Sequence, residues 1–352
     1  MRLRKSFLAG VSLLLSACVP EFDDDLSVLR EPRILALQSE PAEAAEGTVR
    51  LTALVAVPPD SLESPSPDWA LCLERKPLTE LGPVSPRCLA AFASGGPPSL
   101  PLGAGTHVSA TLPADACRLF GPIRPEPKPG EPAGRPVDPD STGGYYQPFI
   151  SALPGTDGPA LGAVRLACGI EGALQAQIVE FNSRYVANGN PAPAAFELVR
   201  DGESIAIPAD PLDGAAPTEV AAGERVQLRV TWPACPREAQ CGDAICSEGE
   251  SASTCAEDCT GGNACAGAES YAWFDPDAKA VVSRRESLRV SWFSSSGQLA
   301  EERTGRSESE ADVNFSENAW RAPRTSGGAR IWVIVRDDRG GVGWQSHTFE
   351  VR

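Results

Sequence analysis

The chain has 352 residues and a formal net charge of −16, with 33 glycines, 33 prolines and 11 cysteines. Such an acidic chain is a poor partner for nucleic acid, or for an anionic lipid surface that a basic face would have to bind. The only histidines are His107 and His347, so a mechanism that needs a histidine cluster is nearly excluded. The high glycine and proline content indicates a loop-rich β architecture.

The first eighteen residues have the parts of a secretory signal. A basic head is followed by an apolar run over residues 7–15, about half of the ~20 residues that span a bilayer. Leu15-Ser16-Ala17-Cys18 resembles the lipobox of bacterial lipoproteins. The resemblance implies cleavage after Ala17, a diacylglycerol thioether on Cys18, and a further acyl chain such as palmitate on the new amine.

The lipobox resemblance predicts a chain that is held to a membrane by lipid. Two or more acyl chains give stable anchoring, and the absence of an aspartate at position 19 favours the outer membrane over the inner one. Removing residues 1–17, which hold three basic side chains and no acidic one, takes the charge from −16 to −19. A plain signal peptide that is cut elsewhere is the alternative.

Residues 18–31 are polar and acidic, and we interpret them as a tether. An N-terminal domain is predicted over 32–170, where the stretch 48–57 alternates apolar and polar residues with the period of a half-buried strand. The proline-rich stretch 121–144 cannot supply the N–H donors of a sheet and is predicted to be a long loop inside this domain.

Setting Cys18 aside leaves ten cysteines, an even number that suggests up to five disulfides and an oxidising compartment. Zinc is not expected, because no CxxC pair has a matching second pair. Four cysteines lie in the N-terminal half and allow three connectivities. Cys72–Cys88 is favoured there, since a short loop closes at the least entropic cost. The other two are Cys117 and Cys168.

A connecting helix is predicted over 171–190. Leu174, Ile178, Phe181 and Tyr185 recur at helical spacing and form one apolar face. This face is expected to pack on the β segments before or after it, and binding to a partner is the alternative.

A C-terminal domain is predicted over 191–352. Val226, Leu228, Val230 and Trp232 alternate along one strand, and Ala329–Arg336 is apolar on both faces, as in a central strand. Regular strands with glycine-rich turns and no alternation with helices favour a sandwich.

The tail from Ser287 to Arg352 resembles bacterial immunoglobulin-like or PKD-like repeats, in which a loop with Trp-x-x-Pro, here Trp320 to Pro323, precedes a strand that ends in an Arg-Asp turn. With the front strands EPRILALQSEP and TVRLTALV, the chain is similar to uncharacterised myxobacterial lipoproteins. The resemblance implies a mainly β fold of two immunoglobulin-like β-sandwich domains joined by one amphipathic helix, with a small disulfide-rich insertion. It implies no established activity.

The insertion, residues 235–265, resembles the CGDGxC–GE–CxxDC repeat of extracellular bacterial proteins, with Ala244 in place of the usual second glycine. So short a segment cannot bury a core and must be constrained by cross-links. Cys235 and Cys265 bracket the insertion and are expected to pair at its base. The inner four are expected to pair among themselves: Cys241, Cys246, Cys255 and Cys259.

Four acidic residues of the insertion could supply the hard oxygen ligands of a calcium ion: Asp243, Glu248, Glu250 and Asp258. A disulfide knot without metal is the favoured alternative. A rigid exposed tip used for recognition is the third interpretation.

The sequence holds no GxSxG elbow, HExxH motif or P-loop. We therefore expect a non-enzymatic, lipid-anchored cell-envelope protein that binds protein or glycan or has a structural role. An adhesion or sensory component of an envelope complex is the alternative, and a hydrolase with an unrecognised pair of carboxylates is a third. A groove with two carboxylates about 5–10 Å apart would favour the hydrolase.

Overall fold

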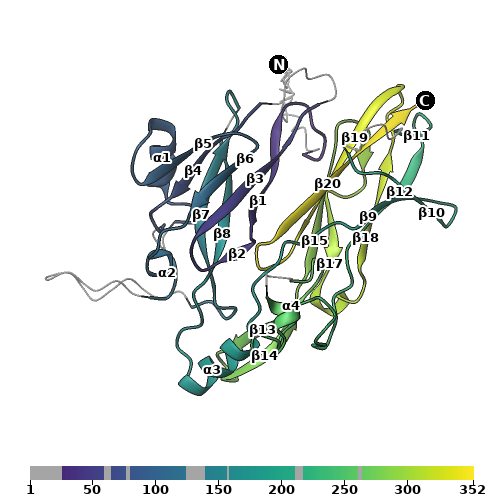
Figure 1. Ribbon diagram of the computed structural model, residues 1–352. Coiled ribbons are helices and arrows are strands. Elements are labelled where there is room, and N and C mark those ends of the chain that lie inside the picture. The colour runs from purple at the N-terminus through teal and green to yellow at the C-terminus, as the bar shows by residue number, and fades with distance from the viewer. Residues whose placement is uncertain are drawn as a thin grey trace, which may run out of the picture.

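The computed structural model describes residues 26–58, 65–76, 80–123, 139–156, 158–210, 217–260 and 264–352 (Figure 1). Cys18, its signal and the first part of the predicted tether lie outside these ranges, as does most of the proline-rich loop 121–144. The described chain is mainly β and forms two sandwiches, so the predicted fold class is confirmed.

The N-terminal sandwich places a three-stranded sheet, in the order β1-β3-β6, against a five-stranded sheet, in the order β2-β8-β7-β4-β5. Its strands are β1 (Arg33–Glu40), β2 (Glu43–Ala44), β3 (Thr48–Ala56), β4 (Asp68–Cys72), β5 (Ser99–Ala104), β6 (His107–Thr111), β7 (Gly144–Ala152) and β8 (Ala160–Ala167), with the helices α1 (Pro86–Ser94) and α2 (Ala116–Leu119). Leu51 from one sheet and Trp69, Leu71 and Phe149 from the other fill the core between them. The alternation read from residues 48–57 is the inward face of β3.

The C-terminal sandwich packs the sheet β10-β9-β12-β18-β16 against the sheet β11-β20-β19-β15-β17. Its strands are β9 (Ala195–Arg200), β10 (Glu203–Ala206), β11 (Thr218–Val220), β12 (Arg225–Thr231), β15 (Leu288–Ser294), β16 (Gln298–Leu299), β17 (Arg303–Arg306), β18 (Phe315–Arg321), β19 (Gly327–Arg336) and β20 (Val342–Val351), with the 3-10 helix Glu308–Glu310. Trp292, Trp320 and Phe349 are fully buried in its core. The repeat resemblance places Trp320 in a loop. In the structure it lies in β18, and its ring is buried in the core of the sandwich.

A third, smaller unit lies beside the two sandwiches. Helix α3 (Gln175–Arg184) packs on the hairpin of β13 (Ser270–Asp275) and β14 (Ala280–Arg285), and Phe181 is the centre of their shared core. The short helix α4 (Ala256–Cys259) belongs to the cysteine-rich insertion. The predicted helical segment 171–190 is therefore helical only in its middle. Leu174 is 69% exposed ahead of the helix, and Tyr185 is already extended, with its hydroxyl hydrogen-bonded to Glu43.

The two sandwiches are packed against each other, as the adjacent positions of β1 and β20 indicate (Figure 1). Leu35 and Ala36 of β1 form one buried cluster with Trp332 and Ile334 of β19. The chain just before β1 joins this contact, because Leu29 is buried and its N–H donates to the Ser294 carbonyl at 2.7 Å. The second apolar face of β19 is therefore an interface between domains.

Candidate functional site

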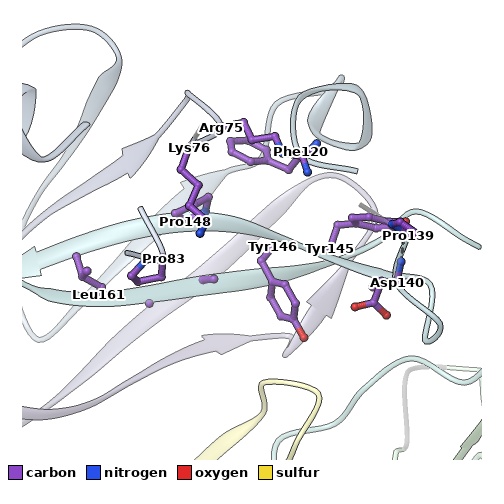
Figure 2. Close-up of a pocket in the computed structure, with 13 residues that line it drawn as sticks. Arg75, Lys76, Pro83, Phe120, Pro139, Asp140, Tyr145, Tyr146, Pro148 and Leu161 are labelled. Atoms are coloured by element: carbon purple, nitrogen blue, oxygen red, sulfur yellow. Dashed lines mark hydrogen bonds between the residues drawn. The ribbon is translucent and has the colours of Figure 1, made fainter. Parts of the chain in front are cut away.

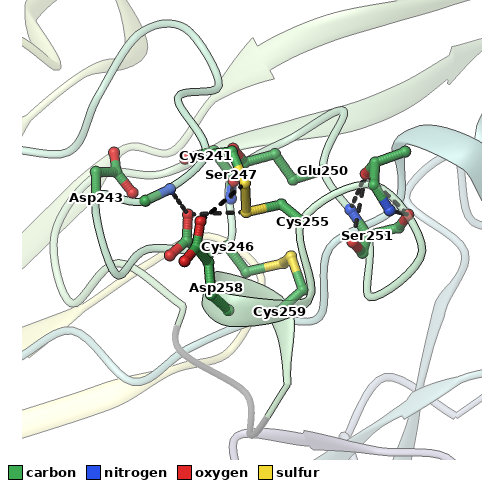
Figure 3. The surroundings of a disulfide bond; sticks show 12 residues. Cys241, Asp243, Cys246, Ser247, Glu250, Ser251, Cys255, Asp258 and Cys259 are labelled. Carbon is green, nitrogen blue, oxygen red and sulfur yellow. Dashed lines mark hydrogen bonds between the residues drawn. A yellow bond between two sulfur atoms is a disulfide. The ribbon is translucent and has the colours of Figure 1, made fainter.

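The ten cysteines other than Cys18 all form disulfides. Cys72–Cys88 and Cys117–Cys168 lie in the N-terminal sandwich, and the first is the pair favoured from loop length. Cys235–Cys265 closes the base of the insertion. The inner four cysteines form Cys241–Cys255 and Cys246–Cys259 (Figure 3). Five disulfides are typical of a protein from an oxidising compartment.

The carboxylates of the insertion act as acceptors for its own backbone. Asp258 is buried and accepts hydrogen bonds from the N–H groups of Gly242 at 2.6 Å and Ala244 at 3.0 Å (Figure 3). Ala244 has φ +66°, in the left-handed region that favours glycine. Asp258 therefore holds a turn that alanine disfavours.

The other predicted calcium ligands are directed to different partners. Asp243 accepts from the Ile245 N–H, Glu250 from the Ser247 N–H, and Glu248 from Arg184 at 2.6 Å. In the described chain, Glu250 and Asp258 approach each other only in a group whose third member is Cys255, and that sulfur is in a disulfide. The four carboxylates do not converge on one point, so they do not fit a calcium site. Glu248 instead fastens the insertion to α3.

A buried polar network joins the two sandwiches, and we call it the junction network. On its N-terminal side, Arg165 of β8 is 2% exposed and pairs with Glu43 at 3.1 Å. Its Nη2 donates to the Thr142 carbonyl at 3.0 Å. Glu43 also accepts from the Asn188 N–H, which follows α3. A side chain at Gly144 would collide with the Arg165 guanidinium and would displace it from its buried partners.

The C-terminal side of the junction network centres on Arg339, in the turn between β19 and β20. Arg339 is buried and donates to Glu269, and to Glu286 at 2.8 Å. Asp337 holds the turn by accepting from the N–H groups of Arg339 and Gly341. Ion pairs removed from water require such complete pairing, because an unpaired charge would be very costly.

Several pKa values in the junction network are shifted. Burial raises the pKa of Glu269 to about 7, although Arg339 opposes this shift. Burial likewise raises the pKa of Glu286 and of Asp337, and Arg339 again opposes the shift. Burial alone would lower the pKa of Arg339, but the carboxylates of Glu286 and Glu269 raise it.

A cavity of about 530 Å³ lies on the outer face of β7 and β8 (Figure 2). We call it the tyrosine–proline pocket. Its lining consists of Arg75, Lys76, Pro83, Phe120, Pro139, Asp140, Gly144, Tyr145, Tyr146, Pro148, Leu161, Gly162 and Ala163. A concave, mostly apolar surface with a few polar groups is the usual form of a binding site.

The polar groups of this pocket differ in how they are engaged. Lys76 donates to the Glu80 carbonyl, and Asp140 accepts from the Thr142 N–H at 2.7 Å. The Nη1 atom of Arg75 is buried and has no hydrogen-bond partner among the described residues. Tyr146 also reaches the junction network, since its hydroxyl donates to the Arg339 carbonyl at 3.1 Å.

The sequence did not indicate this pocket, because its residues come from loops and strands that are far apart in the chain. One signal was present: Tyr146 is a large aromatic on the face of β7 that does not point into the core, and it remains 40% exposed.

Comparisons with known proteins show no family for this chain. No family model matches it, and neither does any curated protein. Solved structures that match include native α-2-macroglobulin of Escherichia coli, 12% identical, with 92% of this chain and 17% of that one covered at a TM-score of 0.22. The adhesin InvE of Yersinia pseudotuberculosis is 9% identical, with 89% of this chain and 58% of that one covered, at a TM-score of 0.17.

A protein of unknown function from Porphyromonas gingivalis W83 is 12% identical, with 90% of this chain and 97% of that one covered, at a TM-score of 0.17. This chain thus spans about a sixth of the macroglobulin's length. Likeness at such TM-scores establishes no shared function. Across the residues that are described, none of the helices combines the length and apolarity needed to cross a membrane.

Proposed function

We propose that this chain is a non-enzymatic binding module of the cell envelope, anchored by lipid on Cys18, which takes a segment of a partner protein in the tyrosine–proline pocket. The observation that carries the proposal is the cavity itself. It is concave and largely apolar, and its Arg75 guanidinium has a buried nitrogen without a hydrogen-bond partner among the described residues.

The chemistry of the pocket favours binding over catalysis. Asp140 is the one carboxylate among its described lining residues, and it is already held by Thr142. Retaining and inverting glycosidases both need two carboxylates. His347 is buried in the C-terminal core, and burial lowers its pKa to about 4. A neutral, buried imidazole of this kind is not placed to act on a bound ligand.

The same residues define the expected ligand. A buried guanidinium nitrogen is best satisfied by a carboxylate, while Pro148 and Leu161 offer apolar contacts. A partner segment with an acidic side chain next to an apolar one fits both. Because Tyr146 lines the pocket and bonds to the junction network, the ligand would contact a surface whose position is fixed relative to both sandwiches.

Site-specific crosslinking in intact envelopes tests the pocket. A photo-crosslinking amino acid is placed at position 161, inside the pocket, or at position 100, on β5 outside it. Leu161 and Leu100 are 37% and 44% exposed, so they are a matched pair. We expect one protein to be captured from position 161 and not from 100, and the Arg75→Gln variant to lose this capture. Equal capture from both positions, or recovery of glycan alone, would contradict the proposal.

The anchor has its own test, which does not depend on the pocket. Mass spectrometry of the native protein should show Cys18 as the first residue with acyl chains attached. The Cys18→Ser variant should leave the membrane fraction. An unmodified thiol at position 18 with the leader still present would refute the lipid anchor and leave the pocket proposal standing.

A further inference from the structure

A second cavity, of about 490 Å³, opens where the two sandwiches meet. Leu26 and Ser27 line one side, together with Arg33 to Leu35 of β1. The other side comes from the C-terminal sandwich: Arg289, Ser291, Trp292, Phe293, Glu302, Arg303 and Arg336. The strands β1, β15 and β17 and the end of β19 each contribute one arginine. We call this cavity the arginine pocket.

The charge of the arginine pocket is opposite to that of the chain. The whole sequence carries −16, yet this pocket has four arginines, and Glu302 is the one carboxylate among its lining residues. Like charges this close repel one another, so a cluster of this kind is unfavourable unless something negative offsets it. The cavity is large enough to admit such a group.

Among the described residues, no carboxylate forms an ion pair with the arginines of this pocket. Arg336 donates to the Leu35 carbonyl at 3.0 Å and to the Ser291 hydroxyl at 3.2 Å, both uncharged acceptors. Arg33 donates to the Leu26 carbonyl at 2.8 Å and lies 5.2 Å from the centre of the Phe293 ring. No ion pair joins any of the four pocket arginines to a carboxylate in the part that the structure describes.

The electrostatics agree with this geometry. Burial, and then the charge of Arg303, lower the pKa of Arg336. Burial also lowers the pKa of Arg33, and Glu31 and Glu302 only partly oppose that. The paired arginines of the junction network show the reverse, because Glu43 raises the pKa of Arg165 against the effect of burial.

We infer that the arginine pocket binds a phosphate group. Guanidinium forks from four strands match the several oxygens of phosphate, and a doubly charged group offsets more of the cluster than one carboxylate would. Its source is either the headgroup of an anionic phospholipid or a soluble phosphate compound. The inference concerns a different cavity from the proposed partner site, so either can fail without the other.

Two probes test the pocket on the full-length protein in neutral detergent. Titration calorimetry with inorganic pyrophosphate should show binding with a stoichiometry of one. Micelles doped with phosphatidylglycerol should displace pyrophosphate if a lipid headgroup is the source, and micelles doped with phosphatidylcholine serve as the reference. Pyrophosphate binding without displacement by phosphatidylglycerol assigns a soluble source.

The variants are chosen so that folding is not at risk. Arg289 and Arg303 are exposed, and Arg289→Gln/Arg303→Gln should weaken either probe by about tenfold or more. The charge-matched control is Arg87→Gln/Arg352→Gln, which removes two exposed arginines that pair with Glu74 and Glu219, and it should bind as the wild type does.

One competitor lies in the sequence itself. Asp23, Asp24 and Asp25 directly precede the pocket residue Leu26, so the assays are repeated with all three changed to Asn. Binding in either background that depends on Arg289 and Arg303 supports the inference. It is overturned if neither probe binds in either background, or if Arg289→Gln/Arg303→Gln binds as tightly as the Arg87→Gln/Arg352→Gln control.

Discussion

Arg336 and Arg339 lie three residues apart at the end of β19 and in the turn that follows, yet the protein treats them in opposite ways. Arg339 is 2% exposed and is enclosed by Glu269, Glu286 and Asp337, so its pKa is raised against the effect of burial. Arg336 is half-buried, meets only uncharged acceptors, and has its pKa lowered by burial and by Arg303.

The difference separates arginines that stabilise the fold from arginines that can bind a ligand. A buried arginine with two carboxylate partners cannot leave them to bind a ligand, because those charges would then be unpaired in the interior. Arginines that face a cavity without carboxylate partners retain donors for a ligand. Both kinds lie at the contact between the sandwiches, which also holds the apolar cluster of Leu35 and Ile334. We call the junction network, which is closed by internal pairing, the closed end of the contact, and the arginine pocket the open end.

The largest expected effect is at the closed end. Arg339→Met leaves Glu269 and Glu286 buried without their cation and should lower the free energy of unfolding by about 4 kcal/mol. Arg336→Met, the matched change, removes two hydrogen bonds to uncharged groups and should cost about 1 kcal/mol. Urea unfolding measures both. If Arg336→Met cost as much as Arg339→Met, the open end would also be structural, and the contrast between the two ends would fail.

The junction network should also make stability depend on pH. The pKa of Glu269 is raised from its ordinary value to about 7, so the folded protein holds this proton more tightly than the unfolded chain does. The resulting stability is fully present below pH 4.5 and is lost as the pH rises through about 7. Between pH 6.5 and pH 8, we expect a loss of about 1 kcal/mol, to which the raised pKa of Glu286 adds.

Unfolding at several pH values in Glu269→Gln measures this contribution. The variant keeps an acceptor for the Gly189 N–H and should show a flatter profile over that range. His347 acts in the opposite direction: burial lowers its pKa to about 4, so its destabilising effect fades as the pH rises past 6.5. This contribution is the same in the wild type and in Glu269→Gln, so the difference between their two profiles isolates Glu269. An unchanged slope in Glu269→Gln would show that the proton is held elsewhere in the network.

Much of the fold could be predicted from local patterns. The alternation of Val226, Leu228 and Val230 gives the inward face of β12, and Asp201-Gly202 forms the tight turn between β9 and β10, with positive φ at both residues. Cys235 and Cys265 pair at the base of the insertion, where a chain that cannot bury a core needs a cross-link. Each of these features depends on neighbours within a few tens of residues.

The two ends of the domain contact could not be predicted in this way. Glu43 and Arg165 are 122 residues apart, and the sequence around Glu43 resembles a turn. The arginine pocket takes one side chain from each of four strands, so no spacing reveals it. The one visible signal was the apolar second face of β19, which was interpreted as that of a central strand. That face carries Trp332 and Ile334 and also meets the other sandwich.

The smallest expected effect is that of Arg303→Gln on the free energy of unfolding, and its sign should depend on whether pyrophosphate is bound. Without ligand, Arg303→Gln removes a charge that repels Arg336, so it should raise the free energy of unfolding by about 0.3 kcal/mol at low salt. The gain should fade as salt is added, because screening weakens the repulsion first. With saturating pyrophosphate the order should reverse, since only the wild-type pocket gains the full stabilisation by a bound ligand. A structural arginine would behave otherwise, and its loss would destabilise the protein at every salt concentration, with or without pyrophosphate.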